Sequence, residues 1–269
     1  MSNKLFADQW AVILGGSSGF GHATVEKLAR NGMNVALLYR EPAFTEKPLL
    51  QKLDALAQEC MVTILPFNIN ALETSGRERF LEKFQETAPK HSVKLLLHSI
   101  ARGNLKPLVT EDKNADTLST LSAEDIQMTT YAMSNSLLDW TRSLLQHDLF
   151  QPDARVIGLT SEGAHKVWEG YAAISLAKSS LESLAKYMAV EFAPYGLKTN
   201  VIQAGITATA SLKKIPGSDK LIEIGETRNP MGRITKPEDV ANVIYLLCMA
   251  EAFWINGALI HVDGGEHCN

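Results

Sequence analysis

Seven short apolar runs, each separated from the next by a longer segment, constrain the fold of this chain more than any other feature. The runs are rich in Val, Ile and Leu and lie at 10–14, 34–39, 60–67, 93–99, 154–161, 197–203 and 257–265. Strands that are apolar along their whole length are expected where helices cover both faces of a parallel sheet. The alternation of such runs with helical segments therefore predicts an α/β fold with one doubly wound, seven-stranded parallel sheet.

The segments between the runs carry helical periodicity, and we expect helices at 22–32, 49–59, 78–88, 122–149, 170–193 and 236–250. The chain has 269 residues, so residues 1–269 fit a single domain. Two stretches, 104–120 and 207–233, are predicted to be loops. Ligands bind sheets of this kind at the carboxyl ends of the strands. Because 207–233 follows the sixth strand, we expect it to act as a substrate lid.

Composition and charge argue against several classes of protein. A net charge of −4 with 45% hydrophobic residues indicates a globular protein without the basic face that nucleic-acid binding needs. No apolar run reaches the roughly 18 residues of a membrane span. The first run is short and no cleavage site follows it, so we expect no signal peptide and a cytoplasmic location. Cys60, Cys248 and Cys268 are odd in number and far apart, which predicts reduced thiols and neither a disulfide framework nor a metal site.

A glycine-rich loop joins the first apolar run to the first helix. Gly15, Gly19 and Gly21 form the pattern G-x-x-x-G-x-G. Glycine lets the backbone turn tightly and approach a pyrophosphate, and the N-terminus of the following helix offers free N–H groups and a positive dipole end to the anion. The loop predicts a dinucleotide site in a Rossmann-type sheet, with Ser17 and Ser18 also in contact with the cofactor.

The end of the second run bears on which dinucleotide is bound. A NAD site usually has an acidic residue here for the ribose 2′-hydroxyl, but this sequence reads Tyr39-Arg40-Glu41. Arg40 offers two donors that suit a 2′-phosphate. Alternatively, Glu41 is the ribose ligand after a slight shift and Arg40 is a solvated loop residue. We predict NADPH, with NADH as the alternative, and place Asn68 and Ile69 at the adenine.

Together with the glycine loop, Tyr171, Lys178 and the Asp-Gly-Gly of 263–265 resemble the short-chain dehydrogenase/reductase superfamily over nearly the whole chain. Most members place the catalytic lysine four residues after the tyrosine, but that position here is Ser175. The lysine follows at seven residues, a spacing typical of the enoyl-acyl-carrier-protein reductase branch. At about 100° per residue, two positions seven apart lie about 20° from each other around a helix, so one face can present both groups.

Three further stretches are similar to that branch. Residues 98–101 read His-Ser-Ile-Ala, where most of the superfamily has an Asn-Asn-Ala-Gly type of turn, and 129–132 read Thr-Thr-Tyr-Ala, similar to a Ser-Ser-Tyr-Ser segment. Residues 203–207 resemble a Ser-Ala-Gly-Pro-Ile segment, and Arg233 with 237–239 matches the region after the lid. The resemblance implies cofactor contacts by Ser99, Ile100, Ala101, Ala204, Gly205, Ile206 and Thr207.

Two departures from the branch concern the substrate. Many enoyl reductases carry a second tyrosine ten residues before the first, but this chain has Ser161, preceded by Thr160, and its glycine loop is of the ordinary length. We predict that Ser161 joins Tyr171 and Lys178 as a catalytic residue, with an acid-site role as in carbonyl reductases, and Thr160 is the alternative.

The resemblance implies reduction of a trans-2-enoyl thioester carried by an acyl carrier protein or coenzyme A. Tyr171 would hydrogen-bond the thioester oxygen as charge collects on it, while Lys178 would bind the ribose and lower the pKa of the tyrosine. Trp168 and Tyr131 are candidates for the wall of the acyl pocket. His98 taken alone is more typical of a core histidine.

Two other functions stay open. A carbonyl or 3-ketoacyl reductase fits Ser161 and the ordinary glycine loop. The second open function is that of a regulatory protein that binds a nucleotide but catalyses no reaction. The presence of both Tyr171 and Lys178 argues against this second function. The resemblance also implies a homotetramer built on the helices at 122–149 and 170–193, although their apolar pattern would equally pack within one subunit. A Lys-Lys pair at 213–214 either attracts an acidic carrier protein or forms a solvated lid surface.

Overall fold

The computed structural model describes residues 5–110, 119–209, 212 and 218–269. Seven strands form one sheet in the order β3-β2-β1-β4-β5-β6-β7, and every neighbouring pair is parallel. The predicted doubly wound, Rossmann-type α/β fold is therefore confirmed. The strands are β1 (Trp10–Leu14), β2 (Asn34–Tyr39), β3 (Ile64–Asn68), β4 (Val93–His98), β5 (Phe150–Ser161), β6 (Leu197–Ala204) and β7 (Leu259–Val262).

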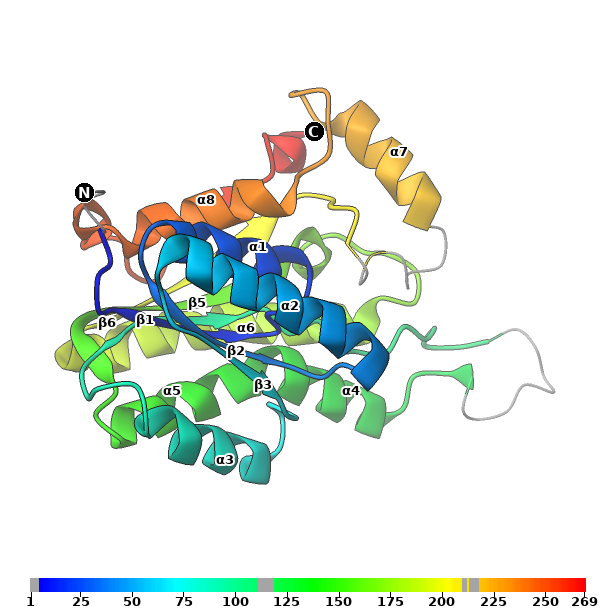
Figure 1. Cartoon of the computed structure of the whole chain (residues 1–269). Helices are drawn as coiled ribbons and strands as arrows, with labels where there is room; N and C mark the ends of the chain where they lie inside the picture. Colours follow the sequence, from blue (N-terminus) through cyan, green and yellow to red (C-terminus); the bar gives the residue numbers. More distant parts are fainter. Residues whose placement is uncertain (1–4, 111–118, 210–211, 213–217) are drawn as a thin grey trace.

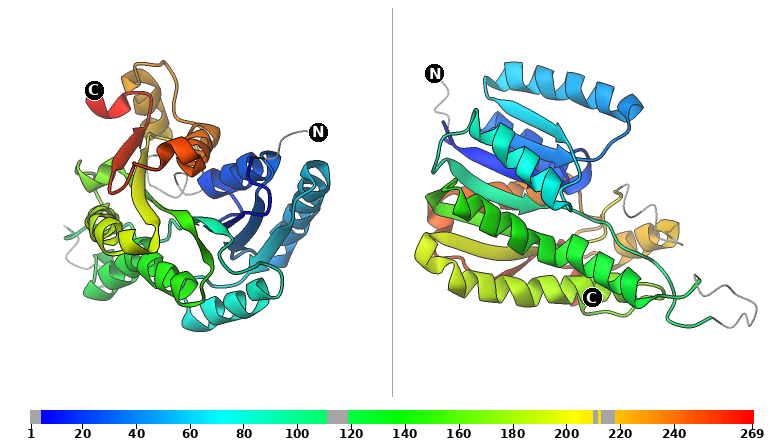
Figure 2. Two further views of the ribbon diagram at one scale, coloured as in Figure 1. Left: turned by 90° about the vertical axis from the view of Figure 1, so that its left-hand side faces the viewer. Right: turned by 90° about the horizontal axis from the view of Figure 1, so that it is seen from below.

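Helices cover both faces of the sheet, as the apolar strands require (Figure 1). One face carries α1 (Gly19–Arg30), α2 (Ala43–Cys60) and α8 (Pro237–Cys248). The other carries α3 (Thr74–Gln85), α4 (Ala123–Thr130), α5 (Ser136–Gln146) and α6 (Ala172–Glu191). The two views of Figure 2 show these layers end-on and from below. A further helix, α7 (Ser218–Arg228), lies beyond the carboxyl ends of the strands.

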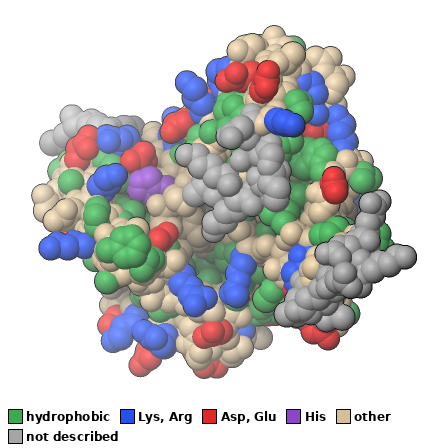
Figure 3. All heavy atoms as spheres, turned by 90° about the vertical axis from the view of Figure 1, so that its right-hand side faces the viewer, with side chains coloured by type: hydrophobic (Ala, Val, Ile, Leu, Met, Phe, Trp, Pro, Cys, Tyr) green, Lys and Arg blue, Asp and Glu red, His purple; other side chains and the backbone are tan. Residues whose placement is uncertain are grey.

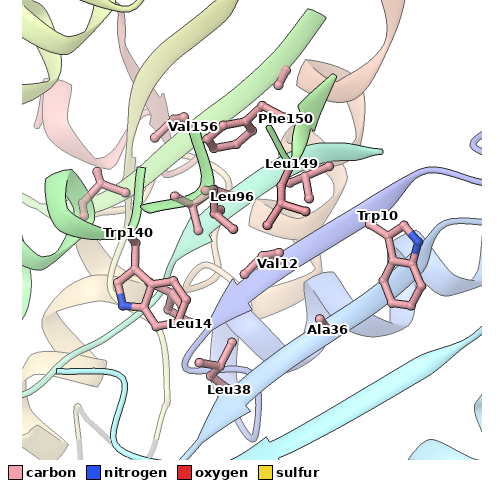
Figure 4. Packing of buried hydrophobic residues seen from close by; sticks show 14 of the residues in the cluster. Trp10, Val12, Leu14, Ala36, Leu38, Leu96, Trp140, Leu149, Phe150 and Val156 are labelled. Atoms are coloured by element: carbon pink, nitrogen blue, oxygen red, sulfur yellow. The ribbon is translucent and has the colours of Figure 1, made fainter. Parts of the chain in front are cut away.

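The core under α3, α5 and α6 is rich in aromatic side chains (Figure 4). Trp140 of α5 is fully buried, and its indole N–H donates to the carbonyl of Ala71 at 2.8 Å. Phe80 packs edge-on against the Trp140 ring and stacks on Phe84, and Trp10 meets Phe84 edge-on. This packing fixes α3 and α5 on the sheet.

Several boundaries differ from those expected from the sequence. The run at 60–67 is not a strand throughout: α2 continues to Cys60, Met61 turns with φ of 51°, and β3 begins only at Ile64. Helix α2 also begins six residues before the expected 49, because its exposed first turns lack apolar periodicity and contain Pro48. The run at 257–265 contributes only its central residues to β7.

Two long segments were also predicted too simply. The helix expected over 122–149 is divided by a π-helical turn at Tyr131–Asn135, which separates α4 from α5. The stretch 207–233, expected to be a loop, contains α7. The Lys-Lys pair at 213–214 lies outside the described residues.

Candidate functional site

Two adjoining pockets lie at the carboxyl ends of the strands, the face seen in Figure 3. One is formed by the glycine loop and the ends of β2 and β4, and the other by the ends of β5 and β6 with α6 and α7. Phe20, Ser99, Ile100, Ala101 and Thr209 line both pockets. The shared wall makes the two spaces suitable for a long dinucleotide beside a second ligand.

The backbone of the glycine loop is packed too closely for a side chain at two positions. A Cβ on Gly15, which has φ of +87°, would lie 2.5 Å from the carbonyl oxygen of Ser99. A Cβ on Gly21 would lie 2.1 Å from the carbonyl oxygen of Gly15. A larger residue at Gly15 would therefore push the loop away from the end of β4, and one at Gly21 would push α1 away from the loop. Ser18 precedes α1 in extended conformation and its hydroxyl makes no cap, which leaves the first N–H groups of α1 for an anion.

The end of β2 holds both a cation and an anion beside the glycine loop. Arg40 is exposed and lines the cofactor pocket. Tyr39 is buried and its hydroxyl donates to Glu46 at 3.1 Å; burial and that carboxylate raise the pKa of Tyr39. The Glu41 carboxylate accepts from the Ser17 hydroxyl at 2.9 Å, so an acid does reach the loop.

The two residues predicted at the adenine are placed differently. Ile69 lines the cofactor pocket. The Asn68 side chain instead pairs with the backbone of Glu41, donating to its carbonyl at 2.8 Å and accepting from its N–H at 3.1 Å. Asn68 thus fixes the turn after β2, and Asn70 takes a place in the pocket wall that the sequence did not indicate.

Ser161, Tyr171 and Lys178 meet in the second pocket. Ser161 ends β5, Tyr171 immediately precedes α6, and Lys178 lies in the second turn of α6. The hydroxyls of Ser161 and Tyr171 lie 3.4 Å apart, and the Ser161 hydroxyl also accepts from the N–H of Gly163 at 3.2 Å. The Lys178 ammonium donates to the carbonyl of Leu159 at 2.8 Å. Thr160, the alternative to Ser161, donates its hydroxyl to Glu182 at 2.7 Å.

Burial dominates the electrostatics of this group. It lowers the pKa of Lys178 to about 8, against the opposing effect of Glu182. Burial raises the pKa of Tyr171, and the hydrogen bond with Ser161 opposes that rise. Lys178 was expected to lower the pKa of Tyr171. The pKa of Tyr171 is raised instead, because desolvation of the phenolate outweighs the other effects.

Apolar side chains, several of them packed against Tyr171, form much of the wall of the second pocket. Trp168 meets the Tyr171 ring edge-on, with centroids 5.2 Å apart. Other apolar lining residues include Leu105, Met133, Leu159, Ile174, Ile206 and Leu212. Tyr131, the other predicted wall residue, is not in the lining and donates its hydroxyl to Asp139 at 2.9 Å. Figure 3 shows apolar side chains gathering between charged residues on this face.

His98 lies beneath the site rather than in it. It is buried at 1% exposure, and its Nε2 lies 2.8 Å from the Ser136 hydroxyl. Burial, followed by the positive charge of Lys178, lowers the pKa of His98 to about 3. A neutral, hydrogen-bonded imidazole agrees with the core histidine that the sequence also allowed.

A polar wall of the second pocket was missed by the sequence analysis. It consists of Glu162, Arg228, Asp263, Glu266 and His267. Arg228 of α7 donates to Glu162 at 2.6 Å and lies 3.3 Å from Glu266, so it ties α7 to both segments. In the sequence, the Asp-Gly-Gly of 263–265 served only as a family motif. Its position directly after the end of β7 could have indicated that Asp263 lines the pocket.

A family model described as Enoyl-(Acyl carrier protein) reductase matches residues 15–267. The chain belongs to this family of the short-chain dehydrogenase/reductase superfamily. It is thus an oxidoreductase of that type, with the fold that binds a nicotinamide dinucleotide.

Relatives within the superfamily carry different names. A tropinone reductase homolog of Arabidopsis thaliana is 26% identical over 96% of this chain and 93% of its own. The enoyl-[acyl-carrier-protein] reductase [NADH] FabI of Aquifex aeolicus is 35% identical, over 49% of this chain and 48% of its own. A structure of the Aquifex aeolicus enoyl reductase superposes with a TM-score of 0.79 at 25% identity, covering 98% of this chain and 99% of that one. A short-chain dehydrogenase/reductase of Serratia marcescens shares the fold, with a TM-score of 0.81 at 20% identity.

Proposed function

We propose that this reductase reduces the trans-2 double bond of an enoyl thioester with NADPH, in fatty-acid synthesis. The spacing of Tyr171 and Lys178 carries the proposal, because Ser175 leaves no lysine at the shorter spacing of carbonyl reductases. The family model with its enoyl reductase description and the apolar wall around Trp168 support it.

The residues present fit a dinucleotide, since Gly15 and Gly21 allow the loop to fold closely onto itself and onto the end of β4, and Ser18 leaves the first N–H groups of α1 uncapped. The loop of Ser17, Ser18 and Gly19 would hold its phosphates, and the walls at 99–101 and 204–207 would hold its nicotinamide end. When bound, NADPH supplies the hydride. The protein supplies binding, orientation and electrostatics.

The Tyr171 hydroxyl acts where negative charge develops. It would donate to the thioester oxygen as that oxygen gains enolate charge, and its buried position strengthens the bond. Ser161, 3.4 Å from the Tyr171 oxygen, would orient it or donate a second hydrogen bond. Lys178 would bind the ribose hydroxyls and keep a positive charge beneath them. The side of the pocket at Trp168 and Met133 would cover the acyl chain and exclude water.

A parallel assay tests the proposal. Purified protein with NADPH is given a crotonyl thioester or an acetoacetyl thioester, and NADPH consumption is followed by absorbance. We expect consumption with the crotonyl thioester. Consumption with the acetoacetyl thioester alone would make the protein a ketoacyl reductase, and no turnover despite NADPH binding would support a regulatory protein.

Carbonyl reduction is the second candidate, and a specific observation favours it. The Ser161 and Tyr171 hydroxyls form a pair that suits a carbonyl oxygen. Relatives called tropinone reductase homologs also cover nearly the whole chain, whereas the enoyl reductase FabI relatives align over about half of it. The acetoacetyl arm of the assay tests this candidate directly.

NADPH is the proposed cofactor on account of Arg40. Arg40 is exposed at the pocket edge, while Tyr39, in the position of a ribose-binding acid, is buried and bonded to Glu46. Glu41 at the Ser17 hydroxyl, and the word NADH in the name of the FabI relatives, favour NADH. The two cofactors can be separated by comparing KM values in the same assay.

We also propose a cytoplasmic homotetramer that acts on acyl chains attached to a carrier protein or coenzyme A. Exposed apolar side chains on α6, namely Leu176, Tyr187 and Val190, support assembly through that helix. No helix in the described part of the chain is long and apolar enough to cross a membrane. Light scattering of the purified protein measures the assembly, and a monomeric mass would contradict it.

A further inference from the structure

A cysteine, a histidine and an aspartate stand in line in the turn that follows β7. The Cys268 sulfur lies 3.3 Å from Nε2 of His267, and Nδ1 of the same ring lies 2.6 Å from the carboxylate of Asp263. A nucleophile next to a base, with the base oriented by a third group, is the arrangement that activates a thiol. Neither the proposed reduction nor the superfamily motif uses this thiol.

The orienting carboxylate is firmly held. Asp263 has a side-chain exposure of 4% and accepts from the backbone N–H groups of Gly265 at 3.0 Å and His267 at 3.1 Å. Burial raises the pKa of Asp263, but the hydrogen bonds from His267 and the backbone outweigh it and lower that pKa overall. An ionised carboxylate at Nδ1 keeps a proton on that nitrogen, which leaves Nε2 to accept the thiol proton.

The base and the thiol are also fixed in position. The His267 ring stacks on His261 with centroids 3.9 Å apart. The backbone N–H of Cys268 donates to Gly265, and the side chain of Asn269 donates to the carbonyl of Arg228 at 2.9 Å. Cys268 itself is exposed, so a reagent can reach it, and the neighbouring His267 lines the second pocket.

We propose that Cys268 is a modification site that reacts with low-molecular-weight disulfides, with His267 as its base and Asp263 as the group that orients the base. The thiol proton passes to Nε2 and the thiolate attacks one sulfur of the disulfide. A bond forms between that sulfur and Cys268, the original S–S bond breaks, and the released thiolate takes the proton from His267. The product is a mixed disulfide on Cys268 with no net change in the number of S–S bonds.

The other two cysteines provide internal comparisons. Cys248 is buried at 1% exposure, and burial raises its pKa to about 12, so it reacts slowly. Cys60 is half-buried at the end of α2. Peptide mapping of the modified protein separates the three sites.

The test measures the rate at which 5,5′-dithiobis(2-nitrobenzoate), an aromatic disulfide, modifies Cys268 at neutral pH. Wild type is compared with His267→Gln, with Cys268→Ser as the blank and His147→Gln as a matched control at a histidine remote from the thiol. Thiol–disulfide exchange depends on deprotonation of the attacking thiol, and its Brønsted coefficient of about 0.4–0.5 limits the effect of losing the base to a few-fold in rate. We expect wild type and His147→Gln to react at least about threefold faster than His267→Gln.

A second variant keeps the proposal testable if His267→Gln does not fold. Asp263→Asn keeps a side chain of the same shape that can still accept from the backbone, and it too should slow Cys268. The Cys60 rate, measured in the same digest, should be unchanged in every variant. Equal Cys268 rates in wild type, His267→Gln and Asp263→Asn, with Cys60 unaffected, would overturn the proposal and leave an ordinary exposed thiol.

Discussion

Replacing Tyr171 by phenylalanine removes one hydroxyl and little else. The structure limits the cost to stability: the Ser161 hydroxyl keeps its bond from the N–H of Gly163 at 3.2 Å, and the ring keeps its edge contact with Trp168. A lost hydrogen bond of this kind costs about 0.5–1.5 kcal/mol of unfolding free energy. The catalytic effect should be much larger, because a missing donor at a developing oxyanion typically lowers kcat by about 10²–10³.

The assay compares three proteins in steady-state turnover of the crotonyl thioester and in NADPH binding followed by fluorescence. Tyr171→Phe should lose about 10²–10³ in kcat while its Kd for NADPH changes less than about twofold. Tyr131→Phe is the matched control, since it also loses a hydroxyl that bonds to a partner, Asp139, but lies outside the pocket lining. If kcat of Tyr171→Phe stays within a few-fold of wild type, Tyr171 does not stabilise the transition state.

Three further predictions concern the lysine, the cofactor and the glycine loop. Lys178→Met should raise the free energy of unfolding by up to about 3 kcal/mol at pH 7, because wild type buries a charged ammonium there. The gain should shrink as pH rises from about 8 toward 10.5, because deprotonation of Lys178 removes that penalty from wild type. Chemical denaturation at pH 7 and pH 10 measures the difference, and a gain that does not change with pH would refute the reasoning. Arg40→Ala should raise the KM for NADPH about tenfold or more and leave the KM for NADH nearly unchanged, as expected for a lost charged contact, while equal effects would contradict the cofactor choice. Gly21→Ala should abolish measurable NADPH binding, since its Cβ would lie 2.1 Å from the carbonyl of Gly15. Gly232→Ala should bind normally, because its Cβ would meet nothing within 4 Å and the backbone strain from its φ of +68° lies outside the glycine loop; normal binding by both would show that the loop tolerates a Cβ.

Much of the fold could be predicted from the sequence because its strands are apolar along their whole length and its loops are marked by glycine. β1, β2 and β4 lie within about a residue of the predicted runs, since each is buried and bounded by turn residues. The start of α2 could not be predicted, because its first turns are exposed and contain Pro48. The π-helical turn between α4 and α5 also left no mark in the apolar pattern.

Part of the candidate site could likewise be predicted from the sequence, and part could not. Tyr171 and Lys178, singled out by their spacing, line the same pocket, and Ser161, expected there from the family resemblance, lies 3.4 Å from the Tyr171 hydroxyl. Arg228 and Glu266 come together only through the tertiary fold, from a helix inside a segment expected to be a loop and from the turn after β7. The raised pKa of Tyr171 likewise depends on burial, which spacing alone does not report.

The central claim, hydride addition to a carbon–carbon double bond, is tested most directly by a competition with labelled cofactor. Equal concentrations of crotonyl and acetoacetyl thioesters are given to the protein with NADPH deuterated at the transferred position, and the products are separated by mass spectrometry. The proposed function predicts deuterium at the β-carbon of the butyryl thioester. Deuterium found only in the 3-hydroxybutyryl thioester, with the crotonyl thioester left unreacted, would contradict it.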